Sequence, residues 1–289
     1  MIGDFALVIG AMRCGTTSLF HYLAGHPQVA ACSEKEPDFF ARDAVWSRGF
    51  DWYQGLWDFD PARHRVALEA STNYSKVSLF PRTVERIAST PARFRLIYLM
   101  RNPIDRIESH YVLGAAKGWP ESRRPLAEFV HPDLVEFTRY AKQLDAFRAR
   151  FPRERMLLLA FEDLAQRPRS VLREVCRFLE IDPDHEFEGL DVVHNSNLGR
   201  RPGDPGQLLY RVRLWIPFWM RLARSVSPER RNALRRRFAR PDVRSPRLSP
   251  EQRAHVLKEL EDDLARLEAE YGFDASPWRL AREPVGAVA

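Results

Sequence analysis

Short apolar runs alternate along the chain with segments whose apolar residues recur every three or four positions. The runs predict strands, because each is short and bounded by polar or turn residues; they cover residues 5–9, 66–69, 94–100 and 156–161. The periodic segments predict helices at about residues 16–24, 82–88, 104–116, 134–150 and 170–179. Strands that alternate with helices predict an α/β fold, in which helices flank both faces of a central parallel sheet.

The pattern changes beyond Asp191. Residues 194–206 are rich in Asn, Gly, Pro and Arg, which is typical of a loop. A long helix is then predicted from Ser249 to Gly272, because Ser249 begins a capping box with Pro at the next position and Gly272 ends the apolar periodicity. We expect this helix to pack on the sheet, and we expect a single domain over residues 1–289.

Residues 208–240 form a basic, aromatic-rich stretch between that loop and the long helix. Three interpretations remain open: a helical lid or insertion that binds an acceptor, a helix at a membrane surface, and an ordinary core helix. Basic residues beside Trp and Phe suit a membrane interface. Peripheral membrane contact, and with it a lipid-linked partner, therefore stays an open expectation.

The composition is that of a soluble globular protein, with 45% hydrophobic and 29% charged residues in 289. No stretch approaches the roughly 20 apolar residues of a membrane-spanning helix, and the first residues lack the pattern of a secretory signal. The three cysteines form no C-x-x-C pair, so neither a zinc site nor a disulfide framework is indicated. We therefore expect a cytoplasmic protein.

The formal net charge is +6, and the positive residues are mostly arginine. A guanidinium group binds phosphate and sulfate in bidentate fashion, so this excess fits an anionic ligand. A solvated, arginine-rich surface is the alternative explanation.

Residues 10–18, Gly-Ala-Met-Arg-Cys-Gly-Thr-Thr-Ser, follow the first predicted strand and open the first predicted helix. At such a junction the backbone N–H groups and the helix dipole form an anion site. The glycines permit a tight turn and close backbone approach, and the loop adds a cation and three hydroxyl groups, from Arg13, Thr16, Thr17 and Ser18. The segment therefore predicts a P-loop-like phosphate site, the alternative being a tight turn that binds nothing.

The spacing of Gly10 and Gly15 equals that of the nucleoside triphosphatase loop, but Thr16 stands where that motif requires lysine. The lysine normally reaches the β- and γ-phosphates. A donor that has no γ-phosphate and needs no metal fits the loop better.

A second anion site is predicted after the strand at 94–100. Asn102 is a candidate N-cap, with Pro103 at the first helical position. Ser109 lies two helical turns beyond the cap, so Arg101 at the strand end and Ser109 can converge on one group. Ligands of parallel sheets sit outside the carboxyl ends of strands. One nucleotide with phosphates at its 3′ and 5′ positions can therefore bridge both loops; a surface ion pair is the alternative role of Arg101.

Taken together, these segments resemble the nucleotide-dependent sulfotransferase family, and more closely the branch of the heparan sulfate sulfotransferases and many bacterial relatives. The resemblance rests on Ile9–Leu19, His26-Pro27, Lys35–Phe40, Glu69–Tyr74 and Leu99–Arg106 with Ser109, in family order, and more weakly on Tyr271–Asp274 near Trp278. It implies a three-layer, P-loop-like α/β fold. The implied donor is 3′-phosphoadenosine 5′-phosphosulfate, which leaves as 3′-phosphoadenosine 5′-phosphate, and no metal is needed.

The resemblance also implies roles for residues. The 5′-phosphosulfate is held by Arg13, Cys14, Gly15, Thr16, Thr17 and Ser18. The 3′-phosphate is held by Arg101 and Ser109, and Arg200 corresponds loosely to a nucleotide-binding loop. Glu36 takes the place of the family's general base, and Arg13 offsets charge on the leaving phosphate.

The sequence departs from this branch at the cation of the phosphate loop and at the residue after Glu69. Arg13 replaces the usual loop lysine, and Ala70 stands where glycosaminoglycan enzymes tend to carry lysine. Ala70 argues against a lysine-assisted proton relay and against a polysaccharide acceptor, and the acceptor classes left open are a small molecule, a glycan and a lipid-linked compound. Rivals to Glu36 as base are Glu34 and Asp38, on the same face if the segment is extended, and Glu69, with His110 and His194 as weaker candidates.

Two other functions compete with sulfuryl transfer. The first is a P-loop kinase or another nucleoside triphosphate enzyme, against which the absent lysine argues. The second is a non-enzymatic, basic protein that binds a polyanion; no helix-turn-helix, zinc finger or RNA-binding motif supports it, and no nucleic acid partner is expected. The sequence carries no signal for oligomeric state.

Overall fold

A computed structural model describes residues 2–123, 125–130, 132–190, 246–278 and 280. Its strands are β1 (Asp4–Gly10), β2 (Val29–Ala31), β3 (Val66–Ala70), β4 (Arg93–Met100) and β5 (Met156–Ala160). Its first helices are α1 (Thr16–Leu23), α2 (Asp43–Trp46), α3 (Phe50–Gln54), α4 (Thr83–Ser89), α5 (Pro103–Lys117), α6 (Leu126–Phe129) and α7 (Pro132–Glu136). They are followed by α8 (Tyr140–Arg148), α9 (Phe161–Gln166), α10 (Pro168–Leu179) and α14 (Pro250–Tyr271).

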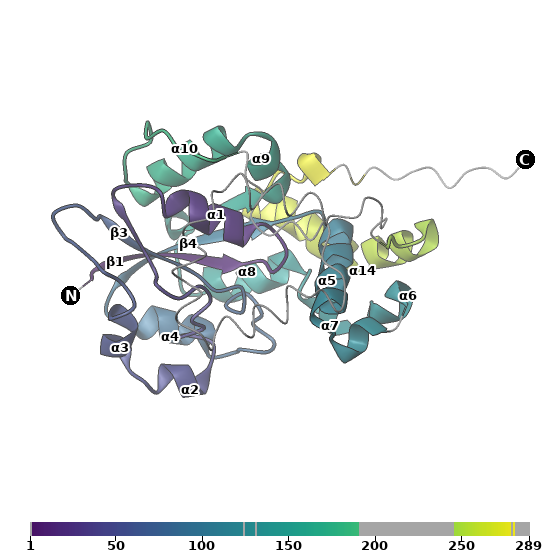
Figure 1. The fold of residues 1–289 in the computed structure, drawn as a ribbon. Helices are drawn as coiled ribbons and strands as arrows, with labels where there is room; N and C mark the ends of the chain where they lie inside the picture. Colours follow the sequence, from purple (N-terminus) through teal and green to yellow (C-terminus); the bar gives the residue numbers. More distant parts are fainter. Residues whose placement is uncertain (1, 124, 131, 191–245, 279, 281–289) are drawn as a thin grey trace, which may run out of the picture.

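The five strands form one parallel sheet in the order β2-β3-β1-β4-β5. Helices α1, α9 and α10 lie on one side of it, whereas α3, α4 and α8 lie on the other (Figure 1). The central strands are buried on both faces, as continuous apolar runs in a parallel sheet require. This confirms the predicted three-layer α/β fold.

The order of the strands places the segments that follow β1, β3 and β4 at one end of the sheet. Strand β1 lies between β3 and β4, and all three run in the same direction. The segments that follow these strands, residues 10–15, 71–76 and 101–102, therefore leave the sheet at the same end.

The strongest capping signals of the sequence are confirmed. The side chain of Asn102 accepts hydrogen bonds from the N–H groups of Ile104 and Asp105 and caps α5. Ser249 and Gln252 form the predicted capping box of α14, and Gly272 ends that helix in the left-handed conformation. Helix α14 packs mainly on α8 and α5 rather than directly on the sheet, which corrects the expectation above.

The single helix predicted over 134–150 is wrong, because the chain forms two helices, α7 and α8. Tertiary contacts stabilise the break. The buried Arg106 donates to the Leu134 carbonyl and to Thr138 Oγ1, and Asp263 of α14 accepts from the N–H groups of Ala141 and Lys142 at the start of α8.

Other differences concern short elements. Phe161, expected at the end of a strand, begins α9. Strand β2 and helices α2, α3, α6 and α9 were not predicted, because segments of three to six residues carry little periodicity. Among the described helices none is long and apolar enough to span a bilayer.

Candidate active site

The phosphate loop, residues 10–15, joins β1 to α1 as predicted. Gly15 has a φ of 87°, and a Cβ atom there would lie 2.6 Å from Cδ2 of Phe161. Only glycine meets both conditions without displacing the aromatic ring. Thr16 and Ser18, in the first turn of α1, are buried. This turn presents the N–H groups that a helix leaves without internal partners, and so it can receive an anion.

Cys14 differs from its neighbours in the loop. Its side chain is fully buried, with Sγ 3.9 Å from the hydroxyl oxygen of Tyr140, and its N–H donates to the carbonyl of Ala11. Burial raises the pKa of the thiol to about 11. The residue expected to bind the nucleotide therefore directs its side chain into the core, and its thiol is protonated at neutral pH.

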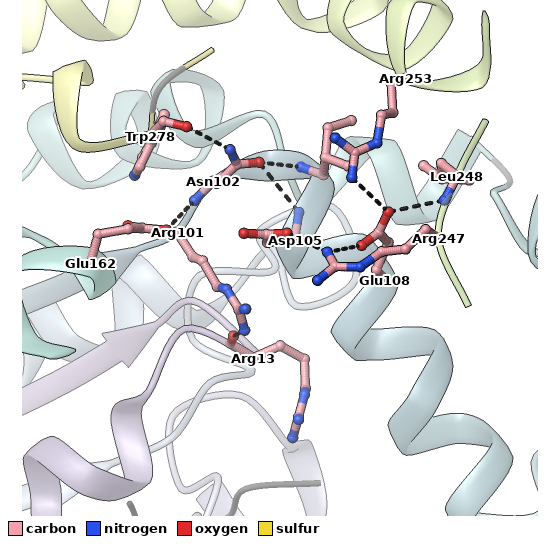
Figure 2. A network of polar contacts seen from close by, with 11 residues as sticks. Arg13, Arg101, Asn102, Asp105, Glu108, Glu162, Arg247, Leu248, Arg253 and Trp278 are labelled. Carbon is pink, nitrogen blue, oxygen red and sulfur yellow. Dashed lines mark hydrogen bonds and ion pairs between the residues drawn. The ribbon is translucent and has the colours of Figure 1, made fainter. Parts of the chain in front are cut away.

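Arg13 connects the two predicted anion sites. Its Nε and Nη2 atoms donate to Ser109 Oγ at 3.0 and 2.9 Å, although the two residues lie 96 positions apart. The Arg13 carbonyl accepts from Arg101 Nη1 at 3.4 Å. Arg13 thus contacts both Ser109, through its side chain, and Arg101, through its carbonyl. The side chains of Arg13 and Arg101 lie beyond the same end of the sheet (Figure 2).

Phe161 supports this cluster, and sequence reasoning missed it. The Arg101 guanidinium carbon lies 4.6 Å from the centroid of the Phe161 ring, and the same ring packs against Gly15. Arg101 Nε is buried and has no hydrogen-bond partner within the described part of the chain. The only signal for Phe161 was its position after an apolar run, which predicted a strand end.

Helix α5 is held from two sides (Figure 2). At its start, Asn102 Nδ2 donates to the Trp278 carbonyl at 2.8 Å, and the Asn102 N–H donates to Glu162 Oε1 at 3.1 Å. Farther along, the buried Glu108 accepts from Arg247, Arg253 and the N–H of Leu248. Because Glu108 precedes Ser109, these contacts hold the segment that carries Ser109.

Glu36 lies at the surface beside the end of β3. Its N–H donates to the Ala70 carbonyl at 3.1 Å, and Oε1 accepts from Lys35 Nζ at 3.0 Å and from Thr72 Oγ1 at 3.3 Å. The carboxylate is 44% exposed, so an acceptor can reach it. Glu36 is therefore placed at the same end of the sheet as the phosphate loop.

The segment around Glu36 is not extended, which corrects the shared face expected for Glu34, Glu36 and Asp38. Glu36 and Asp38 have φ angles of 60° and 56°, in the left-handed region. Asp38 is buried and accepts from Arg42 Nε and Asn73 Nδ2, both at 2.8 Å. Its carboxylate orders the loop, whereas Glu34 remains exposed on the same segment.

Glu69 is fully buried, which makes it a poor rival as a base. It accepts hydrogen bonds from the hydroxyl groups of Tyr53 and Ser71. Burial raises the pKa of its carboxyl group to about 7. A carboxyl group sealed under these side chains cannot meet an acceptor directly.

Of the remaining candidates, one lies within the described residues and the others lie outside them. His110 is buried and packs against the Trp119 ring, at 5.6 Å between centroids, which fits a structural role. His194, Arg200 and the stretch 208–240 lie outside the described residues, so the expectations for them stay predictions.

Comparison with known proteins shows which protein family this chain resembles. Residues 4–198 match the model of the sulfotransferase domain. The chain is 32% identical over 184 residues to mouse heparan sulfate glucosamine 3-O-sulfotransferase 6, a match that covers 60% of this chain and 51% of the relative. It is 28% identical over 208 residues to human bifunctional heparan sulfate N-deacetylase/N-sulfotransferase 3, covering 63% of this chain and 23% of the relative. The chain thus spans about half, or less, of the length of these curated relatives.

A solved structure supports the fold. The sulfotransferase from Alicyclobacillus acidocaldarius superposes with a TM-score of 0.59 at 22% sequence identity, over 96% of this chain and all of that one. The domain match spans the phosphate loop, Glu36, Arg101 and Ser109, so the residues that the structure brings together all lie within it. The chain therefore belongs to the sulfotransferase domain family.

Proposed function

We propose that this protein transfers a sulfuryl group from 3′-phosphoadenosine 5′-phosphosulfate to a hydroxyl or amine group of an acceptor. The observation that carries the proposal is the contact between the two predicted anion sites, in which the Arg13 side chain donates to Ser109 Oγ of α5. A nucleotide with phosphates at both its 5′ and 3′ positions offers one anionic group to each loop. The loop lacks the lysine that a γ-phosphate requires, which disfavours a kinase.

In the proposed reaction the acceptor oxygen or nitrogen attacks sulfur, and the bond from sulfur to the 5′-phosphate oxygen breaks. The acceptor proton passes to Glu36, and 3′-phosphoadenosine 5′-phosphate leaves with the bonding electron pair. Glu36 suits the role of base because its carboxylate is exposed and hydrogen-bonded at the same end of the sheet as the phosphate loop. Arg13 and Arg101 supply the positive charge that offsets the phosphates, so the proposed transfer uses no metal.

The acceptor is proposed by class only. The two named relatives are heparan sulfate sulfotransferases, which supports a glycan or a small molecule with hydroxyl or amine groups. A cytoplasmic location belongs to the same proposal. All three cysteines are free and buried, as in proteins of a reducing compartment.

Calorimetric titration with 3′-phosphoadenosine 5′-phosphate tests the donor site, with ADP and with ATP plus Mg²⁺ as comparison ligands. We expect metal-independent binding that requires the 3′-phosphate. Arg101→Ala should weaken this binding at least tenfold, because a hydrogen bond to a charged group contributes about 1.5–3 kcal/mol, and should leave ADP binding nearly unchanged. Arg82→Ala, an exposed arginine at the start of α4, is the matched control. Preference for ATP with Mg²⁺ would instead support a kinase.

A further inference from the structure

The turn after β3 brings a lysine, Lys76, to the junction between the phosphate loop and the Glu36 segment. Its predecessor, Ser75, donates its N–H to the Ile9 carbonyl at 3.0 Å, and a Cβ atom on Gly10 would collide with Ser75 Oγ. Its successor, Val77, donates its N–H to Gln143 Oε1 at 3.1 Å. The backbone at Lys76 is therefore held on both sides by contacts that do not involve its side chain.

The ammonium group of Lys76 has neutral partners. Nζ donates to Asn73 Oδ1 at 2.8 Å and lies 5.5 Å from the centroid of the Phe137 ring. No ion pair joins it to a carboxylate among the described residues. Asp38 accepts from Arg42 and Asn73 through Oδ2, and its buried Oδ1 has no hydrogen-bond partner in the part of the chain that the structure describes. An ammonium group has three donors, and the hydrogen bond to Asn73 uses one of them.

The surroundings of Lys76 disfavour its protonated, charged form. Burial lowers the pKa of Lys76 to about 8, Arg106 of α5 and Arg42 act in the same direction, and Asp38 and Glu36 oppose them. A half-buried cation without a direct counter-ion is destabilising, and an anionic ligand would offset that cost. The same turn contacts the Glu36 segment, because Thr72 Oγ1 donates to Glu36 Oε1 at 3.3 Å, and Asn73, which accepts from Lys76 Nζ, donates to Asp38 Oδ2.

We propose that Lys76 is a further residue of the transfer site, where its ammonium group binds the sulfuryl oxygens on the side that faces Glu36. The inference rests on the proposed function. Arg13 offsets charge on the leaving 5′-phosphate, and Lys76 offsets charge on the sulfuryl oxygens while the bond to the acceptor forms and the bond to phosphate breaks. Lys76 keeps its proton throughout, because the acceptor proton goes to Glu36.

The test uses the full chain and an assay that needs no identified acceptor: release of 3′-phosphoadenosine 5′-phosphate from 3′-phosphoadenosine 5′-phosphosulfate, with water as the acceptor. We expect Lys76→Met to lower kcat about 100-fold, the effect of removing one stabilising donor. Its affinity for 3′-phosphoadenosine 5′-phosphate should stay within about twofold of wild type, because that product lacks the sulfuryl group. Lys142→Met, an exposed lysine paired with Glu136, is the matched control.

The pH profile separates a chemical role from a structural one. Lys76 is protonated below its pKa of about 8, so the wild-type kcat should fall as the pH rises through that value. Arginine stays charged, so Lys76→Arg should retain activity and move this fall to higher pH. This variant keeps the proposal testable even if Lys76→Met does not fold.

Two outcomes would overturn the inference, and they differ. Wild-type protein that neither binds 3′-phosphoadenosine 5′-phosphate nor releases it from the donor would refute the proposed function, and the inference with it. Wild-type protein that turns over the donor, with the same kcat in Lys76→Met or the same alkaline limb in Lys76→Arg, would refute the role of Lys76 alone.

Discussion

Two glutamates near the end of β3 have opposite surroundings. Glu36 is exposed and accepts from Lys35 and Thr72, whereas Glu69 is fully buried and accepts from Tyr53 and Ser71. A general base must reach the acceptor proton, so the first carboxylate suits catalysis and the second suits the core.

Glu36→Gln tests the base directly. The amide keeps the shape of the side chain but cannot take a proton, so we expect kcat to fall by about 10²- to 10⁴-fold. Calorimetric affinity for 3′-phosphoadenosine 5′-phosphate should not change. Glu34→Gln, two residues earlier and also exposed, is the control. Full turnover in Glu36→Gln would show that another group is the general base.

Glu69 should make stability depend on pH. Its pKa is about 7 in the folded protein and about 4.5 in the unfolded chain, so the folded state binds the proton more tightly. The stabilisation is complete below pH 4.5 and is lost as the pH rises to about 7, by roughly 3 kcal/mol. The measurement is the free energy of unfolding in urea between pH 4.5 and 8, for wild type and Glu69→Gln. The wild-type value should decrease relative to the variant over this range; parallel curves would contradict the prediction.

At the scale of elements, α5 carries Ser109 of the proposed 3′-phosphate site, and the side chain of Asn102 holds its first turn. Asn102 caps the helix with Oδ1 and bonds the Trp278 carbonyl with Nδ2. One side chain thus joins the strand end, the helix and a segment near the end of the described chain.

Substitution of Asn102 separates these two contacts. Asn102→Ala removes both and should lower the free energy of unfolding by about 2 kcal/mol. Asn102→Ser keeps an oxygen that can cap the helix but cannot reach Trp278, so it should lose about half as much. Chemical denaturation of the three proteins measures the difference. Equal stability of all three would show that neither contact stabilises α5.

At the scale of the whole molecule, the order of the strands brings the residues of the proposed site to one end of the sheet. Because β3, β1 and β4 are neighbours and parallel, Glu36 beside β3, the phosphate loop after β1 and Arg101 after β4 meet at one end of the sheet. Distant segments then complete the site, as Phe161 packs under Arg101 and Trp278 bonds Asn102. The domain match extends over 4–198, so Trp278 and α14 lie beyond it.

Local features were predictable from the sequence by itself. The strand–loop–helix junction at Gly10–Thr16, the Asn102 cap and the Ser249 capping box depend on residues within a few positions of each other. Their spacing therefore determined both the elements and the two anion loops. Strand β2 and helix α9 were not predicted, because segments of three and six residues are too short to show a period in the sequence.

Only the tertiary structure decided the rest. The bond from Arg13 to Ser109 crosses 96 residues, and the break between α7 and α8 depends on Arg106 and Asp263. Burial separates Glu69 from Glu36, and the turn after β3 holds the half-buried Lys76 against the neutral side chain of Asn73. Burial and long-range contacts depend on which segments pack together, and spacing along the chain does not encode that.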